Sequence, residues 1–315
     1  MHIRPIAWML ALSLAGAVRP AVADDFNFTM NMDGDKRVSS CDDIQMRFSR
    51  GRKGDDGIVT ARRDKTVVLS AKDASPFRVR SDGRVGIHVQ PSEDGSFSAL
   101  VCMAAGAETQ QAGDAILDQV QVESADGELS VNGPKPGNWG AYVVLSLPRS
   151  VALDLSAENG PLSLRDVSGQ FTLRTINGPI SLAGVSGQVN AEAVNGPIQF
   201  RGHAGDIRLA AQNGPVGVKL DAAAWTGKGL DASTQNGPVM LEAPTGLHAG
   251  VLVEGSEHSP FKLNGIARFP GGGEGGTRTL RMGDGPVLVR LSTVNGPVEI
   301  KGPRPSASRA KLEKI

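Results

Sequence analysis

The sequence predicts an all-β protein, a β-solenoid of about 18 residues per coil that follows a small disulfide-linked β region. Asn-Gly-Pro recurs seven times in the 315-residue chain. The asparagines of these turns are Asn132, Asn159, Asn177, Asn195, Asn213, Asn236 and Asn295. Those from Asn159 to Asn213 are spaced by 18 residues, and a fixed period of about this length indicates stacked repeats.

Apolar residues alternate with polar ones inside each repeat. From Gly160 to Gly214 a glycine falls every nine residues, and apolar residues stand two and four positions after it. This alternation is typical of a short strand with one buried face. The apolar positions are Leu162, Leu164, Phe171, Leu173, Ile180, Leu182, Val189, Ala191, Ile198, Phe200, Ile207, Leu209, Val216 and Val218. We expect a third interior position seven residues after the glycine, at Val167, Ile176, Val185 and Val194.

The turn motif has a physical reading. Asn tolerates the left-handed backbone region, and Gly adopts positive φ at no steric cost. Pro cannot donate to a sheet and suits the first position of a strand. Asn-Gly-Pro therefore ends one strand and begins the next, and Ser-Gly-Gln or Ala-Gly-Asp forms the alternate corner, as at Ser168–Gln170. Asparagines stacked at one corner are placed to bond each other's side-chain amides.

Residues 1–23 have the features of an export signal. A short basic start precedes an apolar stretch over residues 6–18, and Ala21-Val22-Ala23 is a small-x-small cleavage site. The stretch is short for a membrane helix, so cleavage is favoured over anchoring, and no later segment has the length of such a helix. We expect a protein of the periplasm, the cell envelope or the extracellular space.

Composition limits the partners. The chain has 33 basic and 33 acidic residues, and losing Arg4 and Arg19 with the signal leaves 31 − 33 = −2. A near-neutral chain has no global field that attracts nucleic acid, so no nucleic-acid partner is expected.

Cys41 and Cys102 are the two cysteines. In an exported chain they favour one disulfide over a metal pair or a reactive thiol, because disulfides persist outside the cytosol. The bridge would close a loop of about 60 residues, worth roughly 4 kcal/mol at best.

Four regions follow: the signal at 1–23, an N-terminal β region at 24–114, the repeat domain at 115–302 and a disordered basic tail at 303–315. The N-terminal region has short alternating segments separated by Gly or Asp turns, which indicates a small antiparallel sheet. A short helix is expected near residues 110–118.

The segment Tyr142–Pro148 ends in Leu-Pro and leads into Asn159-Gly160-Pro161-Leu162, with Val167-Ser168-Gly169 as the alternate form. This order resembles the bacterial putative-adhesin family of β-strand repeats, a family of unknown function, over about residues 120–301. The resemblance implies a β-solenoid in the envelope or outside the cell, and the family supplies no catalytic residues. Pro after Asn-Gly, where the family more often has Asp, is a departure that disfavours a metal-binding edge.

No catalytic, cofactor-binding or metal-ligating residue is predicted. The carboxylates on the repeats do not recur at one position in adjacent coils, as paired acid/base residues would need to. Four residues are candidate ligand contacts near breaks in the repeat: Trp139, Trp225, His248 and His258. Packing inside the fold is the competing interpretation for both tryptophans.

The sequence therefore favours a non-catalytic exported scaffold, an adhesin or surface-interaction module whose partner is an unknown envelope protein or glycan. A carbohydrate-binding or carbohydrate-active β-helix is the alternative, and an envelope-stress sensor is a third interpretation. We expect the regular coils from Asn159 to Pro215 to be scaffold, and any site to lie near Trp225 or between His248 and Gly276.

Overall fold

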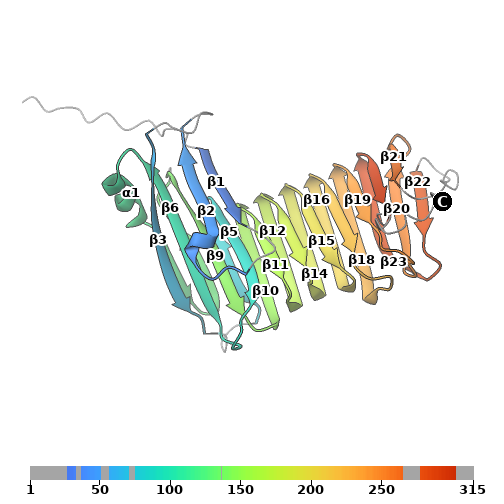
Figure 1. Ribbon diagram of the computed structural model, residues 1–315, viewed down its shortest axis with the longest axis horizontal. Helices are drawn as coiled ribbons and strands as arrows, with labels where there is room; N and C mark the ends of the chain where they lie inside the picture. The colour runs from blue at the N-terminus through green and yellow to red at the C-terminus, as the bar shows by residue number, and fades with distance from the viewer. Residues whose placement is uncertain are drawn as a thin grey trace, which may run out of the picture.

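The computed structural model describes residues 27–32, 37–50, 57–70, 75–135, 137–264 and 277–302. The expected signal at 1–23, the glycine-rich segment at 271–276 and the tail at 303–315 lie outside these residues. The described chain forms two 11-stranded sheets, a two-stranded hairpin and one α-helix (Figure 1). No helix in these ranges combines the length and apolar character needed to span a bilayer.

The elements follow the chain in three groups. The first is β1 (Asn27–Met32), the 3-10 turn η1 (Cys41–Asp43), β2 (Ile44–Ser49), β3 (Val59–Val68), β4 (Phe77–Ser81), β5 (Val85–Pro91), β6 (Ser98–Ala107), α1 (Gln110–Leu117), β7 (Gln121–Ala125), β8 (Glu128–Asn132) and β9 (Trp139–Leu147). The second is β10 (Ser150–Asn159), β11 (Leu162–Arg165), β12 (Ser168–Asn177), β13 (Ile180–Ala183), β14 (Ser186–Asn195), β15 (Ile198–Gly202), β16 (Ala204–Asn213), β17 (Val216–Leu220), β18 (Thr226–Asn236) and β19 (Val239–Glu242). The third is β20 (Gly250–Ser256), β21 (Phe261–Asn264), β22 (Thr277–Met282), β23 (Val287–Asn295) and β24 (Val298–Lys301).

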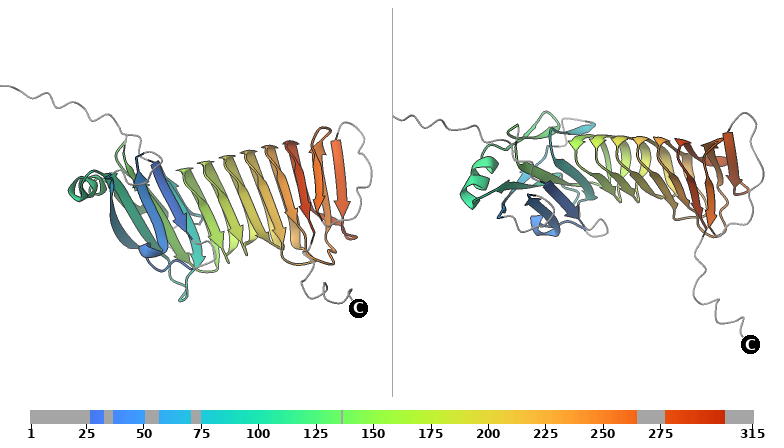
Figure 2. Two further views of the ribbon diagram at one scale, coloured as in Figure 1. Left: turned by 45° about the horizontal axis from the view of Figure 1, so that its top comes forward. Right: turned by 90° about the horizontal axis from the view of Figure 1, so that it is seen from above.

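The chain alternates between the two sheets. Sheet 1 has the order β22-β20-β23-β18-β16-β14-β12-β10-β4-β8-β7, and sheet 2 the order β21-β24-β19-β17-β15-β13-β11-β5-β9-β6-β3. In the regular part, each 18-residue unit gives a short strand to sheet 2 and a ten-residue strand to sheet 1, as β11 and β12 do. Successive units pair in parallel and in register, which makes the elongated two-layer body in Figure 2.

The core lies between the sheets. Its side chains come from both sheets and form one cluster along the body. All fourteen positions two and four residues after the repeat glycines are buried, as the alternation predicts. The four residues expected at the third interior position do not all lie inside. Val167 and Val185 are each 2% exposed and lie inside, whereas Ile176 and Val194 are 49% and 40% exposed. Ile176 directly follows the buried Thr175 on a continuous strand, so the pleat turns it outward.

The turn chemistry also differs from expectation. Asp126 and Asp166 are the only non-glycine residues with positive φ in the described ranges, so the Asn of Asn-Gly-Pro is not left-handed there. Gly178 is needed for a different reason: a Cβ at this residue would overlap the backbone carbonyl of Gly160 in the coil before it. The second corner lies at Asp166 (φ 50°) and Gly184 (φ 63°), before the Ser-Gly pair, which already belongs to the following strand.

The N-terminal strands join the repeat. Residues 59–68 of the N-terminal region form one long strand, β3, and the expected helix is α1. β3 and β6 are antiparallel, but β4 and β5 pair in parallel with β10 and β11, which corrects the expected antiparallel region. The expected division after residue 114 falls within α1. The strands before and after this helix belong to the same two sheets and share one core.

The β1–β2 hairpin forms a third layer on the outer face of sheet 2. Its residues Ile44, Met46 and Phe48 pack against Tyr142, Val144 and neighbouring side chains of β6 and β9. The Cys41–Cys102 disulfide, predicted from the sequence, joins η1 to β6 across 5.5 Å between Cα atoms. The Gln90 side chain holds the segment before η1, because it accepts from the Val38 N–H (3.0 Å) and donates to the Val38 carbonyl (2.7 Å).

Candidate functional site

Parallel register arranges the outward side chains of sheet 1 in three rows that cross the strands. The first row lies beside the Asn-Gly-Pro corner, and the second and third follow at two-residue steps along each strand. The first row is Glu158, Ile176, Val194, Gln212, Gln235 and Val294. From β8 to β23 the second row is Ser130, Arg80, Ser156, Arg174, Glu192, Ala210, Ser233 and Ser292. Over the same strands the third row is Glu128, Arg78, Asp154, Thr172, Asn190, Arg208, Asp231 and Arg290. The outer strands β7, β20 and β22 continue the second row with Glu123, Glu254 and Thr279, and the third row with Ala125, Leu252 and Arg281.

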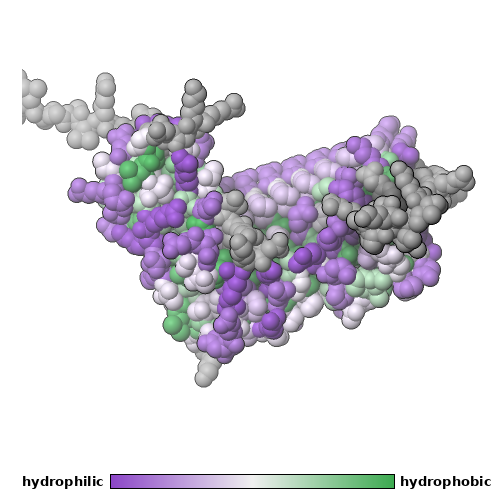
Figure 3. Space-filling model, viewed as in Figure 1, coloured by the Kyte–Doolittle hydropathy of each residue, from purple (hydrophilic) through white to green (hydrophobic). Residues whose placement is uncertain are grey.

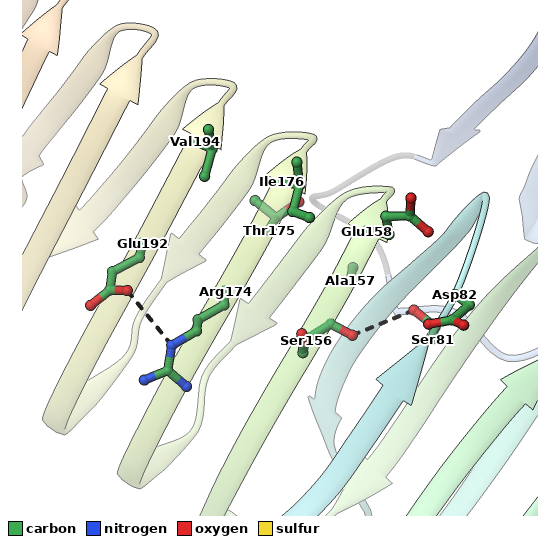
Figure 4. Close-up of a pocket in the computed structure, with 10 residues that line it drawn as sticks. All are labelled: Ser81, Asp82, Ser156, Ala157, Glu158, Arg174, Thr175, Ile176, Glu192 and Val194. Atoms are coloured by element: carbon green, nitrogen blue, oxygen red, sulfur yellow. Dashed lines mark hydrogen bonds and ion pairs between the residues drawn. The ribbon is translucent and has the colours of Figure 1, made fainter.

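A shallow groove of about 450 Å³ lies on this face. We call it the sheet 1 groove. Its lining comes from β10, β12, β14 and the end of β4: Ser81, Asp82, Ser156, Ala157, Glu158, Arg174, Thr175, Ile176, Glu192 and Val194. Figure 4 shows Ile176 and Val194 on adjacent strands near the corner, with Arg174 and Glu192 further along the same strands. The groove thus offers an apolar pair bordered by charges of both signs.

The charges beside the groove form a chain of ion pairs. Arg80 contacts Asp154 at 2.9 Å, and Arg174 lies 3.9 Å from Asp154 and 3.6 Å from Glu192. The Asp154 side chain is only 18% exposed, while the arginines and Glu192 are half-exposed. Exposed pairs of this kind stabilise a fold by about 1 kcal/mol or less. Their effect is to hold the two guanidinium groups across the face, where a partner can contact them.

The third row carries charges outside this network. Within the described ranges, no ion pair or side-chain hydrogen bond reaches Glu128, Arg78, Arg208, Asp231 or Arg290. Arg208, Asp231 and Arg290 line a second hollow of about 190 Å³ further along sheet 1, beside the Lys228–Asp206 pair at 3.4 Å. These charges are therefore available to a partner on the same face as the groove.

The predicted ligand contacts lie elsewhere. Trp139 is 4% exposed and donates its indole N–H to the Pro134 carbonyl at 3.1 Å. Trp225 is 8% exposed, donates to the Gly205 carbonyl at 3.1 Å and packs 6.0 Å from the Phe200 ring. Both rings are packed in the fold and present no open stacking surface.

His248 and His258 are exposed at the C-terminal end of the fold. His248 lies 3.5 Å from Asp284, and His258 lies 3.9 Å from its neighbour Glu257. Neither histidine lines the two hollows, and the backbone N–H of His248 donates to the Ala223 carbonyl at 2.8 Å, two residues before Trp225. Among the residues described, no group of three or more His, Cys, Asp or Glu side chains could hold a metal ion.

The outer face of sheet 2 differs from that of sheet 1. The hairpin covers its N-terminal end, and in Figure 3, which views the molecule from the hairpin side, polar residues predominate. Exposed cations follow one another here at Arg201 and Lys219, and Lys219 contacts Glu242 at 2.6 Å. His203 at the nearby corner contacts Asp221 at 2.6 Å.

His88 of β5 is fully buried. Neither ring nitrogen has a partner in good hydrogen-bond geometry within the described chain. Burial, with the Arg165 guanidinium adding to it and the nearby Gln90 side chain opposing it in part, lowers the pKa of His88 to about 4. A neutral imidazole in this position is part of the packing around sheet 2, not a proton donor at neutral pH.

The sequence reasoning placed the regular coils outside the functional region, yet the groove lies on them. The alternation of inward and outward side chains along each strand indicates these groove residues in the sequence. Phe171, Leu173 and Thr175 face inward, so Ile176 falls on the outward set, and an apolar residue there has no role in the core. The same count applied to Val194 marks the second apolar residue of the groove.

No family model and no curated protein matches this chain. Among solved structures, a putative adhesin from Bacteroides fragilis is 15% identical, with a TM-score of 0.38 over 78% of this chain and 97% of its own. A putative adhesin from Parabacteroides distasonis is 13% identical, with a TM-score of 0.37 over 76% of this chain and 97% of its own. A putative lipid binding protein from the same species is 8% identical, with a TM-score of 0.29 over 76% and 97%. These likenesses are too distant to assign a function to this chain.

Proposed function

We propose that this protein is an exported, non-catalytic β-solenoid that acts as a surface-interaction module of the adhesin type and binds its partner through the outer face of sheet 1. The observation that carries the proposal is the sheet 1 groove. Ile176 and Val194 are large apolar side chains held open to solvent on rigid neighbouring strands, beside the Arg174–Glu192 pair. An apolar centre with a charged border is the usual composition of a protein interface.

The rigidity of the site favours tight binding. The groove residues stand on strands paired on both sides, so their positions are fixed before a partner arrives. Such preorganisation reduces the entropy lost on binding. The export signal predicted for residues 1–23 and the Cys41–Cys102 disulfide support a location outside the cytosol.

The experiment measures binding of the purified mature protein, residues 24–315, to cell envelopes of the organism that produces it. The variant Ile176→Gln/Val194→Gln gives these positions the residue that already occupies the same row at Gln212 and Gln235. We expect at least a tenfold loss of binding, because the apolar centre of an interface commonly carries most of its energy. Thermal unfolding of the variant should match that of the parent protein.

Val294→Gln is the matched control. Val294 is 57% exposed and lies in the same row, but it does not line the groove. We expect this variant to bind as the parent does. Equal binding by all three proteins would overturn the assignment of the face, and turnover of a glycan by the parent protein would overturn the non-catalytic assignment.

A further inference from the structure

The third row of sheet 1 has an ordered charge sequence. From β8 to β23 it reads Glu128, Arg78, Asp154, Thr172, Asn190, Arg208, Asp231 and Arg290. The charges of the first four residues are negative, positive, negative and neutral, and those of the last four are neutral, positive, negative and positive. Reading the row backwards and exchanging every sign returns the same order. The midpoint of this relation falls between β12 and β14, which are also the strands that carry Ile176 and Val194 in the groove.

A row with this property is complementary to itself. A two-fold axis along the strands, placed over the boundary between β12 and β14, reverses the order of the strands and keeps their direction. It sets each residue of a row against a residue of the same row in a second copy. In the third row Asp154 then faces Arg208 of the other copy, Arg78 faces Asp231, and Glu128 faces Arg290. Each contact occurs twice, as an isologous interface requires.

The other two rows agree with the same axis. In the second row Arg174 faces Glu192, and Arg80 faces Ser233. One strand further out, Glu123 of β7 faces Glu254 of β20, a like-charge pair at the rim of the face. In the first row Ile176 faces Val194, so the apolar pair of one groove meets that of the other. Glu158 faces Gln212, a neutral residue. Between β8 and β23, no like charges oppose each other in these three rows.

The face is large enough for a stable contact. Eight strands at about 4.8 Å and about six residues at 3.3 Å give an area on the order of 700 Å² per copy. A standard protein interface buries about 800 Å² on each side. Five of the six charges in the third row between β8 and β23 have no partner within the described chain, and each would gain one across this contact; the sixth, Asp154, already pairs with Arg80 and would also face Arg208.

From the charge order, the apolar centre and the size, we propose that the occupant of the sheet 1 face is a second copy of this chain, bound about a two-fold axis between β12 and β14. The proposal rests on the proposed function, since it names the partner of the same face. Two copies carried on different surfaces, or on one, would adhere through identical faces.

The first test is the oligomeric state of the mature protein by sedimentation equilibrium. We expect a monomer–dimer equilibrium that weakens as sodium chloride rises from about 0.05 to 0.5 M, because exposed charges are screened. Asp231→Arg sets an arginine against Arg78 of the other copy, and Arg78→Asp sets an aspartate against Asp231. Each variant should weaken self-association about tenfold or more.

The second test mixes the two variants. In a mixed dimer, the aspartate introduced at position 78 of one copy meets the arginine introduced at position 231 of the other. The unchanged Asp231 meets the unchanged Arg78, so both contacts are again attractive. We expect the mixture to associate about tenfold or more tightly than either variant alone.

Recovery on mixing also shows that each variant is folded, because both proteins are altered only at charges on the surface. Glu242→Arg is the control. It makes the same kind of charge change on the outer face of sheet 2 and should associate as the parent does.

A monomeric parent at about 0.1 mM would overturn the proposal, as would a dimer that neither charge variant weakens or a mixture that fails to associate. The proposed function fails separately. If the parent is monomeric but Ile176→Gln/Val194→Gln still abolishes envelope binding, the face binds another partner. If the dimer forms as described but envelope binding does not depend on the groove, the face serves assembly only.

Discussion

The side-chain amide of Asn195 donates a hydrogen bond of 3.0 Å to Oδ1 of Asn177, one coil earlier. The same bond joins each neighbouring pair in the ladder Asn159, Asn177, Asn195, Asn213, Asn236 and Asn295, at distances between 2.8 and 3.1 Å. The last two bonds join residues separated by 23 and 59 positions. The ladder therefore follows the stacking of the coils and continues where the sequence period is interrupted.

Asn195→Ala removes two bonds of the ladder, because Asn195 donates to Asn177 and accepts from Asn213. We expect the free energy of unfolding to fall by about 1–2 kcal/mol, since each net hydrogen bond contributes roughly 0.5–1.5 kcal/mol. Urea denaturation measures the change. Asn132→Ala is the control: Asn132 has the same turn motif but no bond in the ladder, so its variant should lose no more than about 0.5 kcal/mol. Equal losses would contradict a contribution from the ladder.

Gly196→Ala places a methyl group against the backbone carbonyl of Gly178, which belongs to a paired strand corner and cannot move away. We expect a loss of about 3 kcal/mol or more, or failure to fold, because two backbones would have to separate. Gly217→Ala is the matched control. Its Cβ meets only the end of the exposed Gln199 side chain, which can rotate, so the loss should stay below about 1 kcal/mol. A Gly196→Ala protein as stable as the parent would show that the corner is loosely stacked.

Stability should fall on acidification because of His88. Its pKa of about 4 in the folded protein lies below the unfolded value of 6.5, so between these values the unfolded chain binds a proton that the folded chain does not. The contribution is complete above pH 6.5 and is lost as the pH falls towards 4, by about 3 kcal/mol in all. Chemical denaturation at a series of pH values measures the slope.

His88→Leu removes this titration. Its stability should depend on pH less steeply than that of the parent between pH 6.5 and 4. His203→Ala is the comparison variant, at an exposed corner where the ring contacts Asp221. It tests whether removing any histidine makes the pH dependence of stability shallower. Identical slopes for the parent and His88→Leu would contradict a buried neutral imidazole.

Reduction should release the N-terminal layer. Cys41 and Cys102 are joined to each other, and the described chain has no other cysteine, so a thiol reductant acts on this bond alone. The closed loop spans 61 positions, which corresponds to at most about 4 kcal/mol. We expect hydrogen exchange to increase first in β1 and β2, with little change in β12 or β14. A uniform increase along the body would mean that the hairpin and the coils unfold together.

The repeat made much of this fold predictable. The 18-residue period, the inward positions two and four residues after each glycine, and the paired cysteines could be taken from the sequence, because turn residues and alternation are local signals. The helix α1 was also local: Thr109 accepts from the Ala112 N–H at its start. The parallel pairing of β4 and β5 with the repeat was not predictable, since no Asn-Gly-Pro motif marks these strands.

The candidate site was missed for two physical reasons. Ile176 and Val194 follow a glycine by seven positions, as Val167 and Val185 do, but the strand pleat separates the two pairs. The charge order of the third row exists only across strands. Its members Arg78 and Asp231 lie far apart in the sequence, and only the observed register places them in one row.

Because the stacked units share one backbone arrangement, the length of this protein can change without a change in its fold. Removing residues 196–213 would bring β17 beside β13 and β18 beside β14, with the corner geometry kept at every level. The shortened chain would retain its core and both ends, yet its third row would lose Arg208 and the antisymmetry of its charges. About the same axis, Asp154 would then face Asp231 of the other copy, and two carboxylates would repel. The number of repeat units therefore sets the charge order of the third row. It can change without altering the architecture, and it determines which copies of the face are complementary.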